Sequence, residues 1–348
     1  MLEKLFHVSI LDWNSVASQS LRNHSSVIPI LTRPIVLSEQ SLVIFGTSTC
    51  YYTAPPLLLS STTAFTETPD IRHELFAVSF SSDHSVLSRD TLTLEWNGYV
   101  TRAGIDDISS ISRDKIVAAM EDSSLRFFQI RNNQLVGIDH ISWPFHATSS
   151  SEQKTCIREM AYSKDGRLWC ARNDGSLGVY HPDSGKWMMI KWSLIRDSFS
   201  SIQVVEDSNP CWITTTSDHG TFYGWDSRQA TEAFHWNSHR QEMFAHRVSR
   251  NEVAIGYGDG KLSILDLRKL DDDALWHSNK ECVVTWIDTQ MQAIGNICAM
   301  DSSLWCCFGS PSSEIWTTLQ SSVAKRQWKV TLQETGDFFY AMNGKYTQ

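Results

Sequence analysis

The apolar residues of this chain fall into short runs that recur in a fixed order from about residue 107 onward. A strand-like run is followed by a tight polar turn, a second run, another polar turn and a third run. The runs are rich in β-branched, aromatic and aliphatic residues, and the turns in Gly, Asp, Asn and Ser. This pattern is typical of short strands joined by hairpin turns. The clearest copies are KIVAAMEDSSLRFFQIRN, RLWCARNDGSLGVYHPD, CWITTTSDHGTFYGWDSR, EVAIGYGDGKLSILDLR and SLWCCFGSPSSEIWTTLQ.

The copies align by their central turn and define an internal repeat. The residues that follow the turn are Ser124, Ser176, Thr221, Lys261 and Glu314, so the period varies from about 40 to 53 residues. A repeat of varying length indicates one structural unit with loop insertions. Further strand-like runs flank each copy, such as DISSIS before the first and KWMMIKW after the second. Four strands per copy predict that each repeat is one blade of a β-propeller.

The predicted fold is therefore all-β: a seven-bladed propeller with four antiparallel strands per blade, in which residues 1–348 form a single domain. Five blades are clear in the pattern, at about 107–141, 156–192, 200–236, 242–277 and 293–332, and weaker ones lie at about 30–65 and 73–104. Closing such a ring requires that the edge strands at the junction be paired. Either residues 5–11 or residues 337–344 could pair across the junction of the termini.

Two of the copies resemble the WD-repeat family of β-propellers. SDHGT (217–221) leads to WDSR (225–228), and GDGK (258–261) leads to LDLR (265–268), and the two segments align without a gap. The chain has no Gly-His pair opening a blade, so the family's Asp-His-Ser-Trp hydrogen-bond network is incomplete. The resemblance implies a diverged member in which packing of apolar strand faces supplies most of the stability.

Composition narrows the class of protein further. The chain has 348 residues, 41% apolar and 20% charged, as in a folded protein with a core. Its formal charge of −9 argues against direct binding of nucleic acid through phosphate neutralisation. No signal peptide and no apolar run of about 20 residues is evident, so no membrane insertion is expected. The eight cysteines form no C-x-x-C pair, and we expect a reduced protein in the cytoplasm, the nucleus or both.

Motifs for catalysis or cofactor binding are missing from the sequence. There is no G-x-S-x-G, P-loop or G-x-G-x-x-G motif, and GYGDGK lies in a predicted hairpin, where its glycines serve the turn. His235, His239 and His246 have a spacing that would suit zinc on a helix. Since His235 ends a predicted strand instead, a structural role is favoured. We expect no cofactor, no metal and no enzymatic activity.

The candidate docking residues lie where the third strand of a copy ends. In the WD-repeat family, segments like 216–228 resemble the box by which receptors dock on the damaged-DNA-binding adaptor of cullin ubiquitin ligases. The resemblance implies that Arg228 docks, that Asp226 orients it after Trp225, and that Arg268 after Asp266 is a second such residue. The alternative is that each Arg simply pairs with a neighbouring carboxylate. A second candidate contact is the acidic loop Asp271, Asp272 and Asp273, which could meet a basic partner or be only a solvated loop.

The functional interpretation is a non-catalytic scaffold for protein interactions, a WD-repeat subunit of a multiprotein complex whose partners are other proteins. One alternative is a substrate receptor of a cullin-type ubiquitin ligase, and another is a structural subunit of the nuclear pore outer-ring type. An enzyme that uses a propeller face as its active site is a further rival, and it would require a deep polar pocket with converging His and carboxylate side chains.

Overall fold

The computed structural model describes twenty segments of the chain, which fall into two compact units. The smaller unit spans Asn14–Trp143, and the larger one comprises Met1–Trp13 with Pro144–Gln348. The described residues are 8–11, 30–31, 35–37, 42–51, 70–80, 86–92, 104–131, 134–145, 155–191, 197–205, 212–228, 231–239, 242–249, 251–270, 283–289, 293–301, 304–310, 312–318, 324–331 and 338–341.

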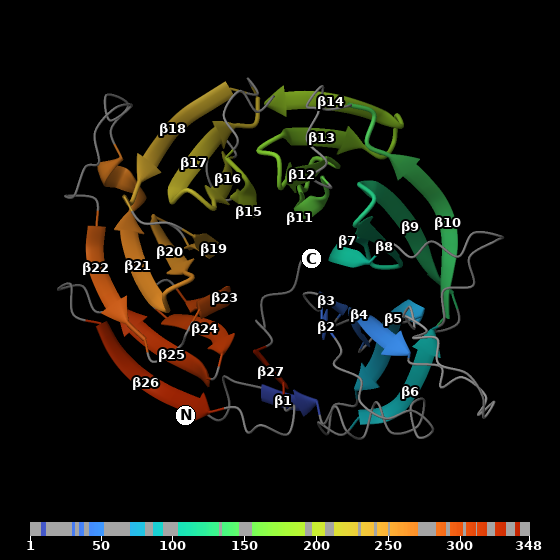
Figure 1. Ribbon diagram of the computed structural model, residues 1–348, viewed down its shortest axis with the longest axis horizontal. Helices are drawn as coiled ribbons and strands as arrows, with labels where there is room; N and C mark the ends of the chain where they lie inside the picture. The colour runs from blue at the N-terminus through green and yellow to red at the C-terminus, as the bar shows by residue number, and fades with distance from the viewer. Residues whose placement is uncertain are drawn as a thin grey trace, which may run out of the picture. The chain divides into compact units, whose positions relative to one another are not determined.

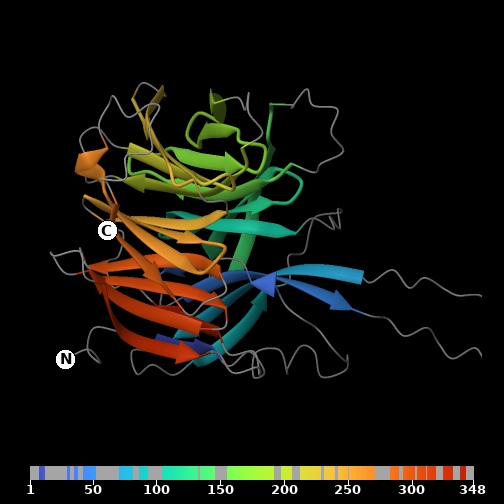
Figure 2. The ribbon, with the colours of Figure 1, turned by 60° about the vertical axis from the view of Figure 1, so that its left-hand side comes forward.

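The larger unit contains four four-stranded antiparallel sheets, each built from strands that are consecutive in the sequence (Figure 1). Neighbouring sheets contact one another through their first strands, and Figure 2 shows them following one another from green to red. The strands are β11 (Ile157–Tyr162), β12 (Leu168–Arg172), β13 (Leu177–His181) and β14 (Lys186–Lys191); β15 (Phe199–Val205), β16 (Trp212–Ser217), β17 (Thr221–Asp226) and β18 (Thr231–Asn237); β19 (Met243–Ser249), β20 (Glu252–Tyr257), β21 (Lys261–Asp266) and β22 (Val283–Asp288); and β23 (Ala293–Asp301), β24 (Leu304–Ser310), β25 (Ser312–Thr318) and β26 (Ala324–Thr331).

The two ends of the chain are joined by a short sheet of their own. Strand β1 (Val8–Leu11) pairs antiparallel with β27 (Phe338–Ala341), from Val8 opposite Ala341 to Leu11 opposite Phe338. The two segments that the sequence offered as alternatives for pairing across the termini are thus paired with each other.

The smaller unit contains one regular sheet and one less regular sheet. The regular sheet consists of β7 (Ile105–Ser112), β8 (Lys115–Met120), β9 (Ser124–Arg131) and β10 (Gln134–Ser142). The other has five strands: β2 (Ile30–Leu31), β3 (Ile35–Leu37), β4 (Leu42–Tyr51), β5 (Asp70–Phe80) and β6 (Val86–Leu92).

This five-stranded sheet covers residues that the sequence analysis divided between two blades. Strand β4 runs without a break through LVIFGTSTCY, in which Gly46 pairs with Leu75 of β5. A lone glycine within a β-rich run does not by itself turn the chain, because glycine also adopts the extended backbone of a strand, and the pairing with β5 continues beyond Gly46. Strand β22 also lies beyond residue 277, where its blade was expected to end. The number of blades and the single-domain organisation therefore stay predictions.

The all-β class is confirmed, and five of the described sheets consist of four antiparallel strands. Among the described residues there is no α-helix, and the one helical element is a 3-10 turn, η3 (Leu267–Lys269). The reason lies in local sequence, since runs of β-branched and aromatic residues fit a pleated surface, and the described strands are two to eleven residues long.

The central hairpin turn has the same geometry in four successive sheets. One residue in each turn has a positive φ: Ser123 at 63°, Gly175 at 76°, Gly220 at 79° and Gly260 at 76°. The backbone N–H of that residue donates to the carbonyl oxygen three residues earlier, over 2.9 to 3.1 Å. Three of the four positions are glycine, the residue that adopts this conformation without steric cost. The repeat unit recognised in the sequence is thus a repeated turn in the structure.

The hydrophobic core of the larger unit lies between the sheets. One cluster joins Trp169 and Val179 of the first sheet to Phe199 and Trp225 of the second. Further clusters lie between the second and third sheets, around Tyr257, and between the third and fourth. The second strand of a sheet is covered on both faces, and in β12 all five residues are buried. This explains why β12 and β20 read as almost continuous apolar runs rather than as alternating ones, whereas β16 is buried through a run of threonines.

We expect Gly220→Ala to destabilise the protein by about 1–2 kcal/mol, because an L side chain at a φ of 79° meets the following carbonyl group. Chemical unfolding followed by tryptophan fluorescence measures this change. The matched control is Gly295→Ala in β23, where an added Cβ has no atom within 4 Å. Equal stability of the two variants would contradict a conformational role for Gly220.

Candidate functional site

Trp225 lies in the core, where its indole ring holds the third strand of the second sheet in place. Its side chain is 3% exposed, and its Nε1 donates a hydrogen bond to Thr215 Oγ1 over 3.1 Å. The ring stacks on Tyr223 with a centroid distance of 5.7 Å. The preceding Gly224 leaves room for Phe234, whose ring carbons would lie 2.2 Å from an added Cβ. Trp225 therefore positions the residues that follow it, and little of its surface is exposed in the free chain.

Asp226 and Arg228 form a bidentate ion pair at the end of β17, and this Asp-x-Arg pair is called a fork below. Asp226 Oδ1 accepts hydrogen bonds from the backbone N–H of Arg228 over 2.8 Å and from its Nε over 3.2 Å. Asp226 Oδ2 accepts from Arg228 Nη2 over 3.0 Å. The carboxylate side chain is 10% exposed and the guanidinium side chain 61%. A buried carboxylate thus fixes the direction of an exposed arginine through a bidentate ion pair.

The same fork recurs at the end of β21, in the neighbouring sheet. Asp266 Oδ1 accepts from the backbone N–H of Arg268 over 3.1 Å and from its Nε over 2.9 Å, and Oδ2 accepts from Nη2 over 2.8 Å. Here Asp266 is the N-cap of η3. The Arg268 side chain is 68% exposed. Leucine replaces tryptophan before this second fork, so the fork depends on the Asp-x-Arg spacing alone.

Electrostatics keep both forks charged. The hydrogen bonds and charge of Asp226 raise the pKa of Arg228, and those of Asp266 raise the pKa of Arg268. The hydrogen bond from Arg268 holds the pKa of Asp266 below its usual range. A guanidinium has five N–H donors, of which the carboxylate uses those on Nε and Nη2. The remaining donors lie on the exposed side of the group, where a carbonyl or carboxylate of a partner can accept them.

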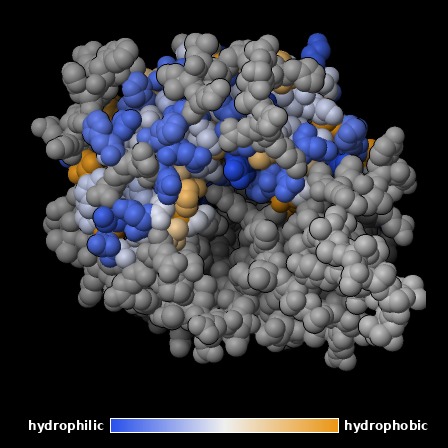
Figure 3. Space-filling view, in the orientation of Figure 1, coloured by the Kyte–Doolittle hydropathy of each residue, from blue (hydrophilic) through white to orange (hydrophobic). Residues whose placement is uncertain are grey.

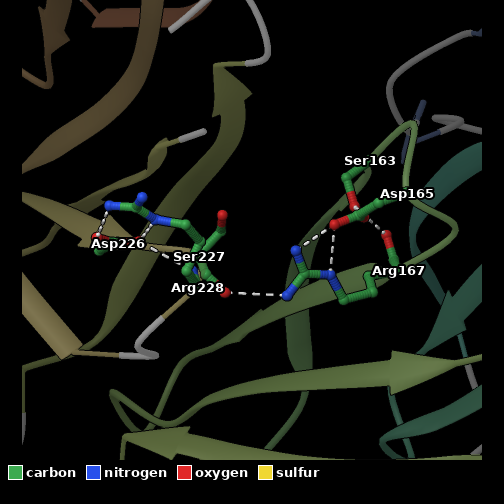
Figure 4. A network of polar contacts seen from close by, with 6 residues as sticks. All are labelled: Ser163, Asp165, Arg167, Asp226, Ser227 and Arg228. Atoms are coloured by element: carbon green, nitrogen blue, oxygen red, sulfur yellow. Dashed lines mark hydrogen bonds and ion pairs between the residues drawn. The ribbon is translucent and has the colours of Figure 1, made fainter. Parts of the chain in front are cut away.

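Arg167 connects the first fork to the sheet that precedes it (Figure 4). Its Nη1 donates to the backbone carbonyl oxygen of Ser227 over 2.9 Å, between the two members of the fork. Its Nε and Nη2 donate to Asp165 Oδ2, and Ser163 Oγ donates to the other oxygen of the same carboxylate. The guanidinium also lies 5.3 Å from the ring centroid of Trp169. The Arg167 side chain thus fixes the position of residues 225–228 by a contact from the preceding sheet.

Arg167 is the residue that the sequence reasoning missed at this site. It stands 60 residues before Ser227 and follows an Asp-Gly turn between two strands. That turn is a local signal for a hairpin, but it does not show which segment of the next sheet lies opposite. The two forks, by contrast, join residues two positions apart, so sequence spacing could find them.

The structure separates the three histidines considered as metal ligands. His235 Nδ1 lies 2.8 Å from Glu232 Oε1, whereas His246 is buried in the next sheet with its Nε2 2.9 Å from Thr214 Oγ1. His239 is exposed in the connection between them. No group of three metal-ligating side chains gathers within the described segments. The acidic loop Asp271, Asp272 and Asp273 lies outside the described residues.

The described surface has few large apolar side chains. On the face shown in Figure 3 the described residues are mostly hydrophilic, with small separated apolar areas. In the larger unit the exposed large apolar side chains among the described residues are Met188, Phe244 and Trp286. No helix in the described part of the chain is long and apolar enough to cross a membrane.

Comparison with known proteins identifies the fold. No family model matches the sequence, and no curated protein matches it. A chain of the solved "Crystal Structure of Mitotic Checkpoint Complex" has a similar fold, with a TM-score of 0.61 at 10% sequence identity over 89% of this chain and 81% of that one. In all, 1394 solved chains match the structure, so the likeness marks a common architecture. Together with the four-stranded sheets it shows an all-β, propeller-type fold.

The stability that Asp266 contributes should depend on pH. A carboxyl group whose pKa is lowered on folding stabilises the fold above its unfolded pKa of about 3.9, and this contribution is lost as the pH falls through the folded pKa. Asp266→Asn should therefore lower the free energy of unfolding at pH 7, and its difference from wild type should shrink in acid below about pH 4. Urea unfolding of both proteins across this range measures the difference.

The matched control for this measurement is Asp259→Asn, since the Asp259 side chain is 47% exposed in a turn and pairs with Lys261 over 3.4 Å. We expect a smaller loss of stability at neutral pH for this variant, because exposed ion pairs contribute little. If the free energies of unfolding of wild type and Asp266→Asn differ by the same amount at neutral and acid pH, the Asp266 carboxylate does not stabilise the fold as an ionised group.

Proposed function

We propose that this chain is a non-catalytic interaction module, a WD-repeat-like subunit of a multiprotein complex. The observation that carries the proposal is the pair of Asp-held arginines, Arg228 and Arg268, at the same position in neighbouring sheets. An arginine fixed by a buried carboxylate loses little conformational entropy when it binds, so it presents its free donors to a partner at low cost. Arginine is also enriched among the residues that dominate binding energy at interfaces.

The setting of the forks supports binding more than catalysis. Each guanidinium is exposed at a strand end, and its carboxylate is held in an ion pair with it, which makes that carboxylate a poor acceptor of a proton from a substrate. The similar solved chain comes from a structure of a mitotic checkpoint complex. That likeness concerns the fold, and a fold of this kind supports many functions, so the proposal rests on the forks.

A second candidate function is substrate reception for a cullin-type ubiquitin ligase. It is favoured by one specific observation, the exposure of Arg228 with Asp226 orienting it, which is the arrangement that the resemblance to docking boxes implies. In this arrangement the neighbouring fork of Arg268 would form a second contact. The nuclear pore outer-ring alternative has no comparable observation in its favour.

Affinity purification of the tagged full-length chain tests the proposal. We expect the wild-type protein to co-purify with a defined set of proteins, and the double variant Arg228→Ala and Arg268→Ala to lose at least one of them by roughly tenfold, as is common when an interface arginine is truncated. The matched control is Arg158→Ala, an exposed arginine of β11 in the same unit. Mass spectrometry with quantitation measures the recovery, and thermal unfolding confirms that each variant is folded.

The outcomes distinguish the two functions. Recovery of the damaged-DNA-binding adaptor by the wild type, lost in the double variant, supports the ligase receptor. A stable partner set without that adaptor, lost in the same way, supports a subunit of another assembly. If the wild-type chain recovers no partner above the level of an untagged control, or if Arg158→Ala has the same effect as the double variant, the role assigned to the forks is wrong.

A further inference from the structure

The side chain of Lys191, the last residue of β14, enters a group of three aromatic rings that belong to the next sheet. Its Nζ lies 4.4 Å from the ring centroid of Tyr223, 5.0 Å from that of Trp225 and 5.5 Å from that of Phe199. A cation within about 6 Å of a ring centroid is attracted by the negative face of the ring. Phe199, Tyr223 and Trp225 therefore form an aromatic cage around an ammonium group.

The geometry of the aromatic cage is fixed by contacts that do not involve the lysine. Tyr223 and Trp225 stack with an interplanar angle of 29°, and Phe199 meets both rings edge-on, at 84° and 82°. The Tyr223 hydroxyl donates to Asp197 Oδ2 over 2.7 Å, and the Trp225 indole donates to Thr215. The cage is thus pre-organised, and a ligand entering it does not have to order the rings.

Access to the aromatic cage is from the side where Lys191 enters. Phe199 and Trp225 are buried, at 0% and 3% exposure, and they form the floor of the cage. Tyr223 and Lys191 are only partly buried, and Lys191 ends an outer strand whose other residues are also partly or fully exposed. A cation from solution can therefore reach the same rings once the lysine side chain moves aside.

A lysine ammonium is poorly matched to this cage. It carries three N–H donors and is strongly hydrated, whereas ring faces replace little of that hydration. Burial accordingly lowers the pKa of Lys191, and Glu232 and Asp197 oppose this only through the attraction of their charges. A trimethylammonium group has no N–H to leave unsatisfied, and it is the type of cation that aromatic cages recognise.

We propose that the aromatic cage is a binding site for the trimethylated lysine side chain of a partner protein, and that Lys191 occupies this site in the free chain as an internal competitor. The site lies in the larger unit and does not use the guanidinium groups of Arg228 or Arg268. The inference thus goes beyond the scaffold function and can hold or fail independently of it.

The test measures binding of the amino-acid probe Nα-acetyl-trimethyl-lysine methylamide to the purified full-length chain. Lys191→Ala opens the cage, whereas Lys191→Met removes the same charge and refills the cage with an apolar side chain. We expect Lys191→Ala to bind the probe roughly tenfold more tightly than wild type. The reason is that the probe no longer has to displace the Lys191 ammonium group from its cation-π contacts. Lys191→Met should bind more weakly than Lys191→Ala. Calorimetry or tryptophan fluorescence reports the affinity.

Two comparison ligands identify the chemistry that is recognised. The unmethylated lysine probe should bind Lys191→Ala more weakly than the trimethylated one, and so should the neutral isostere in which a tert-butyl carbon replaces the quaternary nitrogen. Equal binding of the charged probe and the neutral isostere would overturn the proposal, because the site would then be merely apolar. Absence of binding to a folded Lys191→Ala variant, or equal affinities of the Ala and Met variants, would also overturn it.

If a variant does not fold, the melting temperature of the wild-type chain in the presence of a quaternary ammonium salt tests the proposal. Choline chloride should raise this melting temperature more than sodium chloride at the same concentration, because a ligand that binds the native state stabilises it. An equal shift with the two salts would overturn the proposal. Since these measurements use the purified chain, a negative result in partner purification does not affect them.

Discussion

The structure depends on one constraint: the inner strands of its antiparallel sheets carry side chains, mostly apolar and in β16 largely threonine, that must be covered on both faces. Strand β12 is buried throughout, and five of the six residues in each of β16 and β20 are buried. Full burial of one large apolar side chain contributes about 1.5–3 kcal/mol. Each sheet in the larger unit therefore packs against the next, as the clusters around Trp169 and Tyr257 show. A series of sheets meets this constraint without any helix.

Apolar packing is not directional, and polar side chains on the first strands, buried or half-buried, add directional contacts between neighbouring sheets. Glu159 Oε2 accepts from the backbone N–H of Ile202, across the first pair of sheets. Gln203 both donates to the carbonyl oxygen of Val248 and accepts from its N–H, across the second pair. Breaking such a contact would leave a buried group unsatisfied, which is costly. These contacts supply directional bonding between the sheets.

The sequence is informative where structure follows from neighbouring residues. The repeated turns at Gly175, Gly220 and Gly260 and the Asp-x-Arg forks are local, so their residues and spacing were predictable. The single sheet formed by strands β2 to β6 was not predicted, because pairing of β4 with β5 is decided by which long strands meet in space. The contact of Arg167 with Ser227 and the aromatic cage around Lys191 were not predicted either. Each joins residues from different sheets, and the sequence does not show which segments of two sheets lie opposite each other.

Trp225 explains how one segment can serve both candidate binding sites. Its ring forms part of the floor of the aromatic cage, and its backbone leads directly to Asp226 and the exposed guanidinium of Arg228. Because the ring is fixed by Thr215 and by stacking on Tyr223, the strand end is rigid in both settings. Replacing Trp225 would disturb the core and both sites at once, so it would not distinguish them. Exposed Arg228 and partly buried Lys191 are the positions at which binding can be separated from folding, since the core does not depend on either charged group.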